Sequence, residues 1–252
     1  MKMLRISRFL YVWGPDIRQR AVTMDPVLPI LIAATLVAAT PVEDREYTFM
    51  HFLVHPQRPQ LPAEKAQKVQ AEHLENLGSL GRSGKLIAAG PMENAGRIRG
   101  ICILVVPPDE VRTLMAKDAT VRENLLIVET LRWKAPVGFT GKAKEPMELT
   151  QAGLAYFNKG PRWETLLPTA SEALWKEHEA FCAGLATEGK VLVRGPVLDE
   201  HHRREILICR SDNAAEVEAM LAASPAVKGG LLSVEAYRWW YGKGTLPAKD
   251  GD

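Results

Sequence analysis

The chain has 252 residues, and its 32 Lys and Arg against 30 Asp and Glu give a formal net charge of +2. Charges of both signs are scattered, which argues against the basic patch of a nucleic-acid-binding protein. The three cysteines, Cys102, Cys182 and Cys209, are odd in number and widely spaced, and they form no CxxC pair and no zinc pattern. Cys102 and Cys209 lie in apolar runs, which predicts small buried hydrophobes.

The first 44 residues differ in character from the rest. Basic residues precede an apolar run at 26–42, and the small residues Val37-Ala38-Ala39 stand before Thr40. This pattern predicts a signal peptide cleaved after Ala39 and a secreted or periplasmic protein. Two alternatives stay open: an N-terminal arm of a cytoplasmic protein, and Met24 as the true start. The run is short for a bilayer-spanning helix of about 20 residues, so we expect no membrane span in the mature chain.

The elements of the next segment follow from its apolar periodicity. We expect a strand at 47–54, a helix at 63–83, a strand at 85–89, a turn at 92–96, a strand at 97–106, a helix at 110–117 and a strand at 124–133. The third strand has apolar residues at both alternating sets of positions, so both faces of its sheet should be covered.

Short landmarks then recur 105 or 106 residues further on. Glu72-His73, Gly84-Lys85, Gly90-Pro91 and Arg132-Trp133 return as Glu177-His178, Gly189-Lys190, Gly195-Pro196 and Arg238-Trp239. A spacing that drifts by one residue indicates two copies of one domain. We predict a leader at 1–44, domain 1 at 45–136, a solvated linker at 137–150, domain 2 at 151–241 and a flexible tail at 242–252.

The second copy repeats the order β-α-β-β-α-β, with capping boxes expected at Thr169 with Glu172 and at Asn213 with Glu216. This order is the split-βαβ, ferredoxin-like arrangement, with helices on one sheet face. The predicted fold class is therefore α+β, with two ferredoxin-like units packed sheet to sheet within one chain. Each copy is small, so packing against the other would enlarge its core.

One histidine lies on the apolar face of the long helix in each copy: His73 near Val69 and Leu77, and His178 near Leu174. Two interpretations stay open, a buried histidine hydrogen-bonded to backbone and a general acid or base at a pocket edge. Asp118 could orient His73, or it could be an ordinary solvated carboxylate. The matching residue in the second copy is Ser224, which cannot supply that charge.

Other polar positions carry weaker signals. Gly90-Pro91 and Gly195-Pro196 are expected to end the second strand of each copy, as hairpin turns or at the mouth of a pocket. Asp199, His201 and His202 are metal-ligand types, but adjacent histidines should point apart on a strand, so no metal site is predicted. Trp133 and Trp239-Trp240 should serve packing or line a pocket.

In the first copy, Glu72-His73-Leu74, Gly84 to Pro91, Lys117-Asp118 and the closing strand to Trp133 resemble the YCII-related family of the dimeric α+β barrel superfamily. In the second copy, the resemblance rests on Lys176 to His178, Glu188 to Pro196 and Ser224-Pro225. It covers about 46–135 and 151–241. It implies ferredoxin-like units that pair into a barrel, and a His-Asp dyad that maps to His73 and Asp118. The family's Asp-Pro becomes Asp118-Ala119 and Ser224-Pro225 here, so at most one full dyad survives.

Relatives in that superfamily include muconolactone isomerase and a dehydrochlorinase. The first functional hypothesis is therefore an acid/base enzyme of isomerase or lyase type, with His73 moving the proton, Asp118 orienting it, and no cofactor or metal. The second is a binding or sensor module for a small molecule. Candidate binding positions are His178, Ser224, Gly90, Pro91, Gly195 and Pro196. The two copies should form a pair within the chain, and further homo-oligomers are possible.

Overall fold

The computed structural model describes residues 43–141, 143 and 147–246. The predicted leader lies almost wholly outside them. The first half comprises β1 (Asp44–Val54), α1 (Ala63–Arg82), β2 (Leu86–Glu93), β3 (Ile98–Leu104), α2 (Pro108–Met115), α3 (Ala119–Arg122) and β4 (Leu126–Pro136). The second half comprises β5 (Leu149–Lys159), α4 (Pro168–Thr187), β6 (Val191–Pro196), β7 (Arg203–Cys209), α5 (Ala214–Ala222), α6 (Pro225–Lys228) and β8 (Leu232–Gly242).

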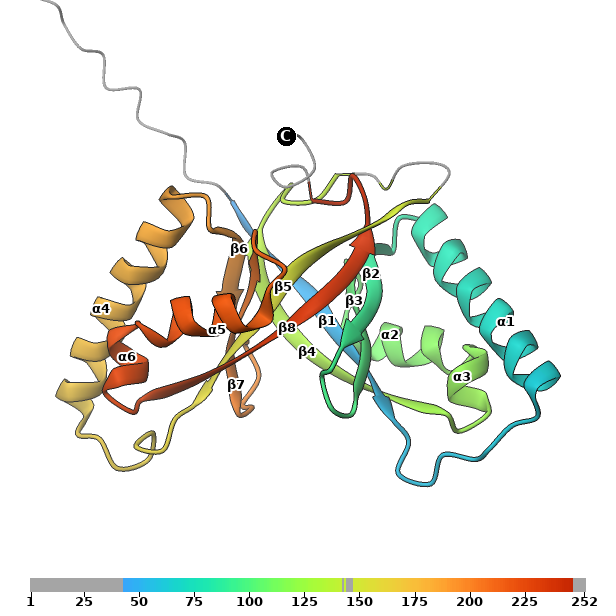
Figure 1. Cartoon of the computed structure of the whole chain (residues 1–252), viewed down its shortest axis with the longest axis horizontal. Coiled ribbons are helices and arrows are strands. Elements are labelled where there is room, and N and C mark those ends of the chain that lie inside the picture. Colours follow the sequence, from blue (N-terminus) through green and yellow to red (C-terminus); the bar gives the residue numbers. More distant parts are fainter. Residues whose placement is uncertain (1–42, 142, 144–146, 247–252) are drawn as a thin grey trace, which may run out of the picture. The chain divides into compact units, whose positions relative to one another are not determined.

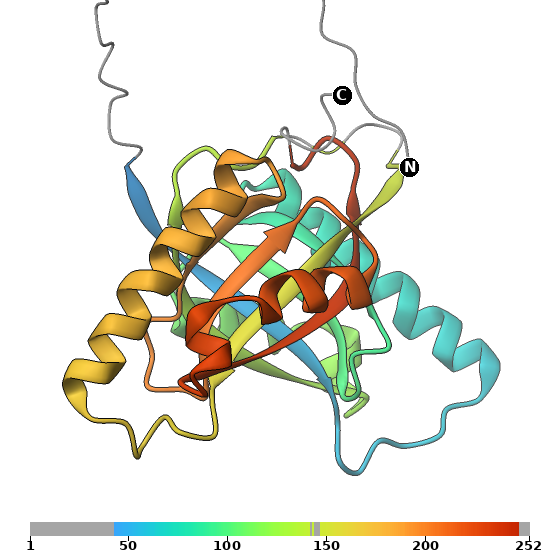
Figure 2. The same ribbon diagram turned by 60° about the vertical axis from the view of Figure 1, so that its left-hand side comes forward.

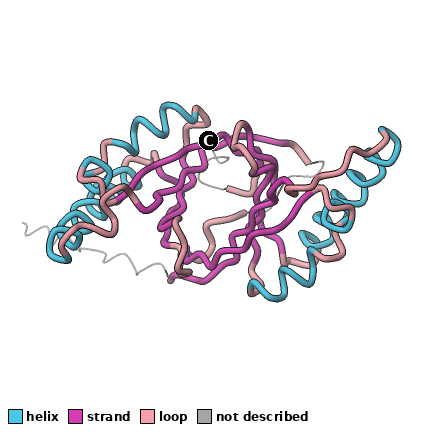
Figure 3. Tube along the Cα trace, turned by 90° about the horizontal axis from the view of Figure 1, so that it is seen from below, coloured by secondary structure: helices cyan, strands magenta, loops and turns pink. Residues whose placement is uncertain are grey.

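All eight strands belong to one antiparallel sheet in the order β4-β1-β3-β2-β8-β5-β7-β6. The halves join where β2 pairs with β8, with Met92 opposite Trp239. At the other end of this order β4 meets β6, because Trp133 bridges Val197 and the Leu198 amide donates to the Arg132 carbonyl at 2.9 Å. The sheet is thus a nearly closed barrel (Figure 3), with the helices of each half outside their own strands (Figures 1 and 2). The predicted α+β fold class is confirmed.

The apolar side chains form cores on both faces of the strands. Inside the barrel, Trp133 of β4 and Trp239 of β8 are fully buried in one cluster that both halves supply. Separate clusters lie between the strands and helices of each half. Strand β3 serves two of them, because Ile101 belongs to the barrel interior and Cys102 to the helix side. This explains why the third strand is apolar at both alternating sets of positions.

The Gly-Pro pairs correct one expectation. Gly90 and Pro91 lie inside β2, which continues to Glu93, and Gly195 and Pro196 close β6. A Cβ on Gly90 would clash with the Trp240 carbonyl oxygen. A Cβ on Gly195 would clash with the Lys134 carbonyl oxygen in the same way. These glycines are thus needed where the strands of the two halves approach closely, and neither pair forms the expected hairpin turn.

Helix boundaries also differ from expectation. The chain adds two short helices, α3 and α6, because Asp118 and Ser224 each begin a new turn after the preceding helix. Asn213 caps α5 as predicted, accepting from the Ala215 and Glu216 amides. The other predicted box is wrong: α4 starts at Pro168, so Thr169 already lies inside the helix and caps nothing.

Parts of the predicted linker and tail pack on the core. Phe139 contacts the rings of Tyr47 and Trp133 at centroid distances of 5.3 and 5.5 Å. Thr245 and Leu246 are buried, and the Thr245 carbonyl accepts from the Gly141 amide at 2.7 Å. These contacts form because the linker and the tail, although mostly polar, contain apolar side chains that pack against the barrel core. No helix in the described ranges is long and apolar enough to cross a membrane.

Candidate functional site

The first half brings His73 and Asp118 into contact. His73 lies in α1, and its Nδ1 is 2.8 and 3.0 Å from the two Asp118 carboxylate oxygens. Asp118 is held in place as the N-cap of α3, where its Oδ1 accepts from the Thr120 amide at 3.0 Å and the Thr120 hydroxyl at 2.5 Å. Asn76, one turn after His73, donates from Nδ2 to Asp118 Oδ2 at 3.0 Å. The carboxylate therefore accepts from three side chains and one amide.

These contacts fix the charge of Asp118 and the tautomer of His73. Burial of the Asp118 carboxyl raises its pKa, but the hydrogen bonds from His73 and Thr120 outweigh burial, so the pKa lies below its usual value. An ionised carboxylate only accepts, so Nδ1 of His73 donates to it, and in the neutral form of the imidazole Nε2 keeps its lone pair. Among the described residues no hydrogen bond reaches Nε2, and the His73 side chain keeps 12% of its surface exposed. The edge of Phe52 packs on the imidazole at 5.2 Å between centroids.

The second half holds its histidine differently. His178 of α4 is fully buried, and its Nε2 lies 2.9 Å from Glu205 Oε2 on β7. Its Nδ1 lies 2.8 Å from the buried Ser224 hydroxyl, which donates because Nε2 carries the proton toward the carboxylate. Arg194 of β6 donates to the other Glu205 oxygen at 2.7 Å and also pairs with Glu179. Both nitrogens of this imidazole are occupied, and no part of it reaches solvent.

The sequence of the first half matches one family profile, described as the YCII-related domain, over residues 50–134. This match contains both His73 and Asp118. No sequence among the curated proteins compared matches the chain.

Solved structures confirm the fold. The chain is similar to a mutant chlorite dismutase from Candidatus Nitrospira defluvii in complex with cyanide, at 13% identity and a TM-score of 0.50, covering 79% of this chain and 92% of that one. It is also similar to a protein described as a putative chlorite dismutase, at 10% identity and a TM-score of 0.50, covering 81% of this chain and 96% of that one. At such identities the likeness concerns the fold alone.

Sequence reasoning paired His73 with Asp118 and placed Ser224 opposite His178, and the structure brings both pairs together. It missed Glu205, whose carboxylate contacts His178 and which stands in a mostly apolar strand. It also missed Thr120, although the spacing Asp118-Ala119-Thr120 is a recognisable N-cap signal. Gly90, Pro91, Gly195 and Pro196 lie along the junction of the two halves, and their role in ligand binding stays a prediction.

A second polar cluster lies at one end of the barrel interior. His51 Nε2 is 2.9 Å from the Tyr156 hydroxyl, and its Nδ1 is 2.9 Å from Glu129 Oε2 in an orientation poor for a hydrogen bond. Arg203 lies between Glu129 at 3.3 Å and Glu235 at 3.6 Å. Because these residues come from both halves, the cluster joins the halves electrostatically.

The predicted geometry of His201 and His202 is wrong, since their ring centroids are only 4.2 Å apart in the turn. Asp199 does not join them in a metal-ligand set. It binds Arg132 instead, accepting from the backbone amide at 2.6 Å and from Nε at 2.9 Å. This contact holds the turn between β6 and β7 against β4.

Within the described ranges, one group has the donor types and spacing of a metal site: His178, Cys182 and Glu205. Its contacts fit a hydrogen-bonded core better. Cys182 Sγ is 3.7 and 3.9 Å from the two ring nitrogens of His178, which places the sulfur beside the ring and out of line with either lone pair. Arg194 already binds Glu205, and burial raises the Cys182 pKa to about 12, away from the thiolate form that metals bind.

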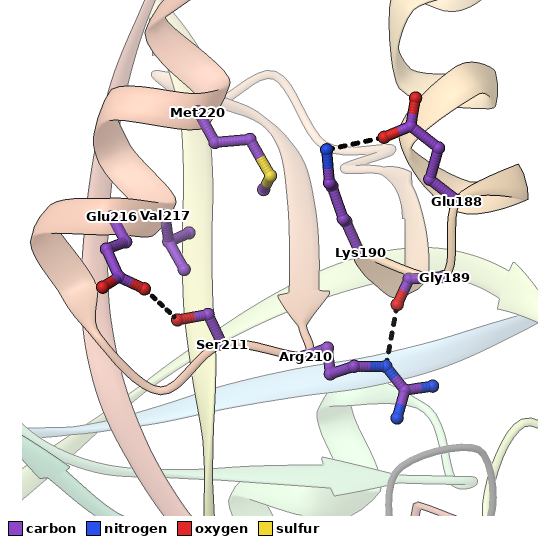
Figure 4. A pocket seen from close by; sticks show the side chains of 8 residues that line it. All are labelled: Glu188, Gly189, Lys190, Arg210, Ser211, Glu216, Val217 and Met220. Carbon is purple, nitrogen blue, oxygen red and sulfur yellow. Dashed lines mark hydrogen bonds and ion pairs between the residues drawn. The ribbon is translucent and has the colours of Figure 1, made fainter.

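A surface cavity of about 490 Å³ lies elsewhere, between the α4–β6 turn and the start of α5 (Figure 4). Its polar residues contact one another: Lys190 pairs with Glu188 at 2.6 Å, Ser211 donates to Glu216 at 3.0 Å, and Arg210 donates to the Gly189 carbonyl at 2.9 Å. None of the predicted site residues lines it.

Proposed function

We propose that His73 and Asp118 form the acid/base centre of an enzyme that isomerises a small organic molecule or eliminates a group from it. The observation that supports this is the state of the two imidazole nitrogens. Nδ1 is held by a buried, ionised carboxylate, and Nε2 has no partner among the described residues. An imidazole in this state is a general base that is oriented and ready to take a proton.

The chemistry needs only this chain's own groups. Nε2 takes a proton from an activated C–H of the substrate, and Asp118 stabilises the imidazolium that results. In an isomerisation, Nε2 returns the same proton to a different carbon, and a double bond shifts. In an elimination, the electron pair of the broken C–H bond forms a double bond while a leaving group departs with its own pair.

Exchange of substrate protons for deuterium tests this proposal. In D₂O, ¹H NMR would follow loss of the acidic C–H signals from a panel of small cyclic ketones and lactones. We expect His73→Gln to slow the exchange about 100-fold or more, the usual worth of a general base. Asp118→Asn should slow it less, since it keeps an N-cap but loses the charge. His55→Gln is the matched control, because His55 is partly exposed and its ring accepts a hydrogen bond from the Gln57 amide.

Chemical modification tests the site without a substrate. Diethyl pyrocarbonate reacts with accessible, unprotonated imidazole nitrogen, so peptide mass spectrometry should show modification at His73 and none at the buried His178. Exchange that persists in His73→Gln, or a His73 as unreactive as His178, would contradict the proposal. Ligands that raise the melting temperature without any exchange would support the binding-module alternative.

Two finer points accompany this function. The 105- and 106-residue spacing and the shared element order support an origin of the halves by tandem duplication, with the catalytic role kept in the first half. The signal-like leader supports export, which an N-terminus at Thr40 in the mature protein would verify.

A further inference from the structure

The second half shows which side chains fill the space beside its histidine. Glu205 lies opposite Phe157 in the β5–β7 ladder, and the edge of Phe157 packs on His178. In the first half, the residue opposite Phe52 is Gly100, and Phe52 packs on His73 in the same way. Gly100 therefore occupies the position of Glu205, and nothing extends from it toward His73 Nε2.

The cation that accompanies Glu205 is also missing from the first half. Arg194 lies opposite Leu207 in the β6–β7 ladder. The matching pair in the β2–β3 ladder is Ala89 and Cys102, so Ala89 stands at the position of Arg194. Glycine and alanine thus stand in the first half at the two positions where the second half has glutamate and arginine.

Each histidine nevertheless contacts one carboxylate, but the carboxylate lies at a different ring nitrogen in each half. In the second half Glu205 takes Nε2, and a neutral hydroxyl, Ser224, takes Nδ1. In the first half Asp118 takes Nδ1, which leaves Nε2 without a partner. A carboxylate on Nε2 as well would place a second buried anion beside Asp118.

The position that supplies the balancing cation in the second half, that of Arg194, is occupied by Ala89 in the first half. Ala89 offers no charge, and two of the cations on neighbouring elements are already paired: Lys85 with Glu110 at 2.8 Å, and Arg122 with Glu72 at 2.6 Å. Burying an unbalanced charge is costly, whereas a neutral donor satisfies the Nε2 lone pair at no such cost.

We propose that the first half selects a ligand that is uncharged where it meets His73 Nε2 and donates a hydrogen to it, and that Ala89 and Gly100 set this preference. The inference rests on His73 being the ligand site, as in the proposed function, and adds the charge of the ligand. The body of the ligand should be apolar, because Phe52 packs on the His73 ring and belongs, with Leu77 of α1 and Val128 of β4, to the apolar cluster between the strands and helices of this half.

Benzamide and benzoate are a matched pair of probes, since they share size and shape while benzamide is neutral and donates N–H. Their dissociation constants would be measured by NMR titration of the intact protein, with the His73 ring resonances as the reporter. We expect benzamide to bind at least tenfold more tightly than benzoate, and His73→Gln to weaken benzamide at least tenfold. Ala89→Arg should reverse the preference by supplying the cation that Arg194 supplies to Glu205. Ala89→Leu adds bulk without charge and should keep the preference for benzamide.

Benzoate binding as tightly as benzamide would overturn the inference, as would an Ala89→Arg variant, folded by circular dichroism, that still prefers benzamide. Failure of both probes to bind would overturn it too. These results are separable from the proposed function. If the protein does not prefer benzamide to benzoate but still exchanges substrate protons, only the inference about ligand charge is wrong. If it prefers benzamide but does not exchange protons, only the catalytic role is wrong.

Discussion

Replacing Glu205 with glutamine is the most direct test of the buried network in the second half. Glu205 is 4% exposed and holds both His178 and Arg194, at 2.9 and 2.7 Å. Glutamine keeps the shape but removes the charge, so Arg194 loses its buried counterion. Breaking a buried pair from one side costs about 3–5 kcal/mol, and since Arg194 keeps some exposure and its contact with Glu179, we expect about 3 kcal/mol. For a domain near 200 residues this lowers the melting temperature by about 6–12 °C.

Glu179→Gln is the matched control, because Glu179 binds the same guanidinium from a side chain that is 56% exposed. An exposed ion pair is worth about 0–1 kcal/mol, so this variant should unfold within a few degrees of the wild type. Urea denaturation gives both free energies of unfolding. Equal losses for the two variants would refute the view that Glu205 is a buried structural substitute for a ligand. Recovery of stability when Arg194→Met is added to Glu205→Gln would support it, since both charges are then gone.

Two further predictions concern the junction of the halves. Contact with His51 lowers the pKa of Glu129 to about 2, against the opposing effect of burial. A carboxyl group whose pKa is lower in the folded than in the unfolded protein stabilises the fold at pH values above its unfolded pKa, and this stabilisation is lost as the pH falls. We therefore expect the wild type to be more stable than Glu129→Gln by about 1–2 kcal/mol after solvent screening, and this difference should vanish between about pH 5 and pH 2. An advantage independent of pH in acid denaturation would contradict this. Gly195→Ala forces a methyl group into the Lys134 carbonyl and should cost about 3 kcal/mol or more, whereas Gly184→Ala meets no atom within 4 Å and should add about 0.5–1 kcal/mol. Equal denaturation midpoints for these two alanine variants would show that the junction is not tightly packed.

Much of the fold follows from the sequence because the signals are local and occur twice. Periodicity locates each long helix, and the doubly apolar third strand already requires cover on both faces, which the barrel interior and the helices supply through Ile101 and Cys102. The positions of the Gly-Pro pairs could not be deduced this way. Glycine before proline is typical of a turn, and the carbonyl that demands Gly90 belongs to Trp240 in the other half. A close approach between distant strands leaves no trace in local propensity.

The residues of the candidate site likewise differ in whether a local sequence signal reveals them. His73 and Asp118 are joined by two local features, a histidine on an apolar helix face and an N-cap, and the resemblance to a known family links them. Glu205 has no such cue, because it stands in an apolar strand and its partners His178 and Arg194 lie 27 and 11 residues away. A histidine repeated in both copies would suggest equal roles. The structure separates them, because Glu205 of β7 contacts Nε2 of His178, whereas Gly100 stands at the matching position in the first half and leaves Nε2 of His73 without a side-chain partner among the described residues.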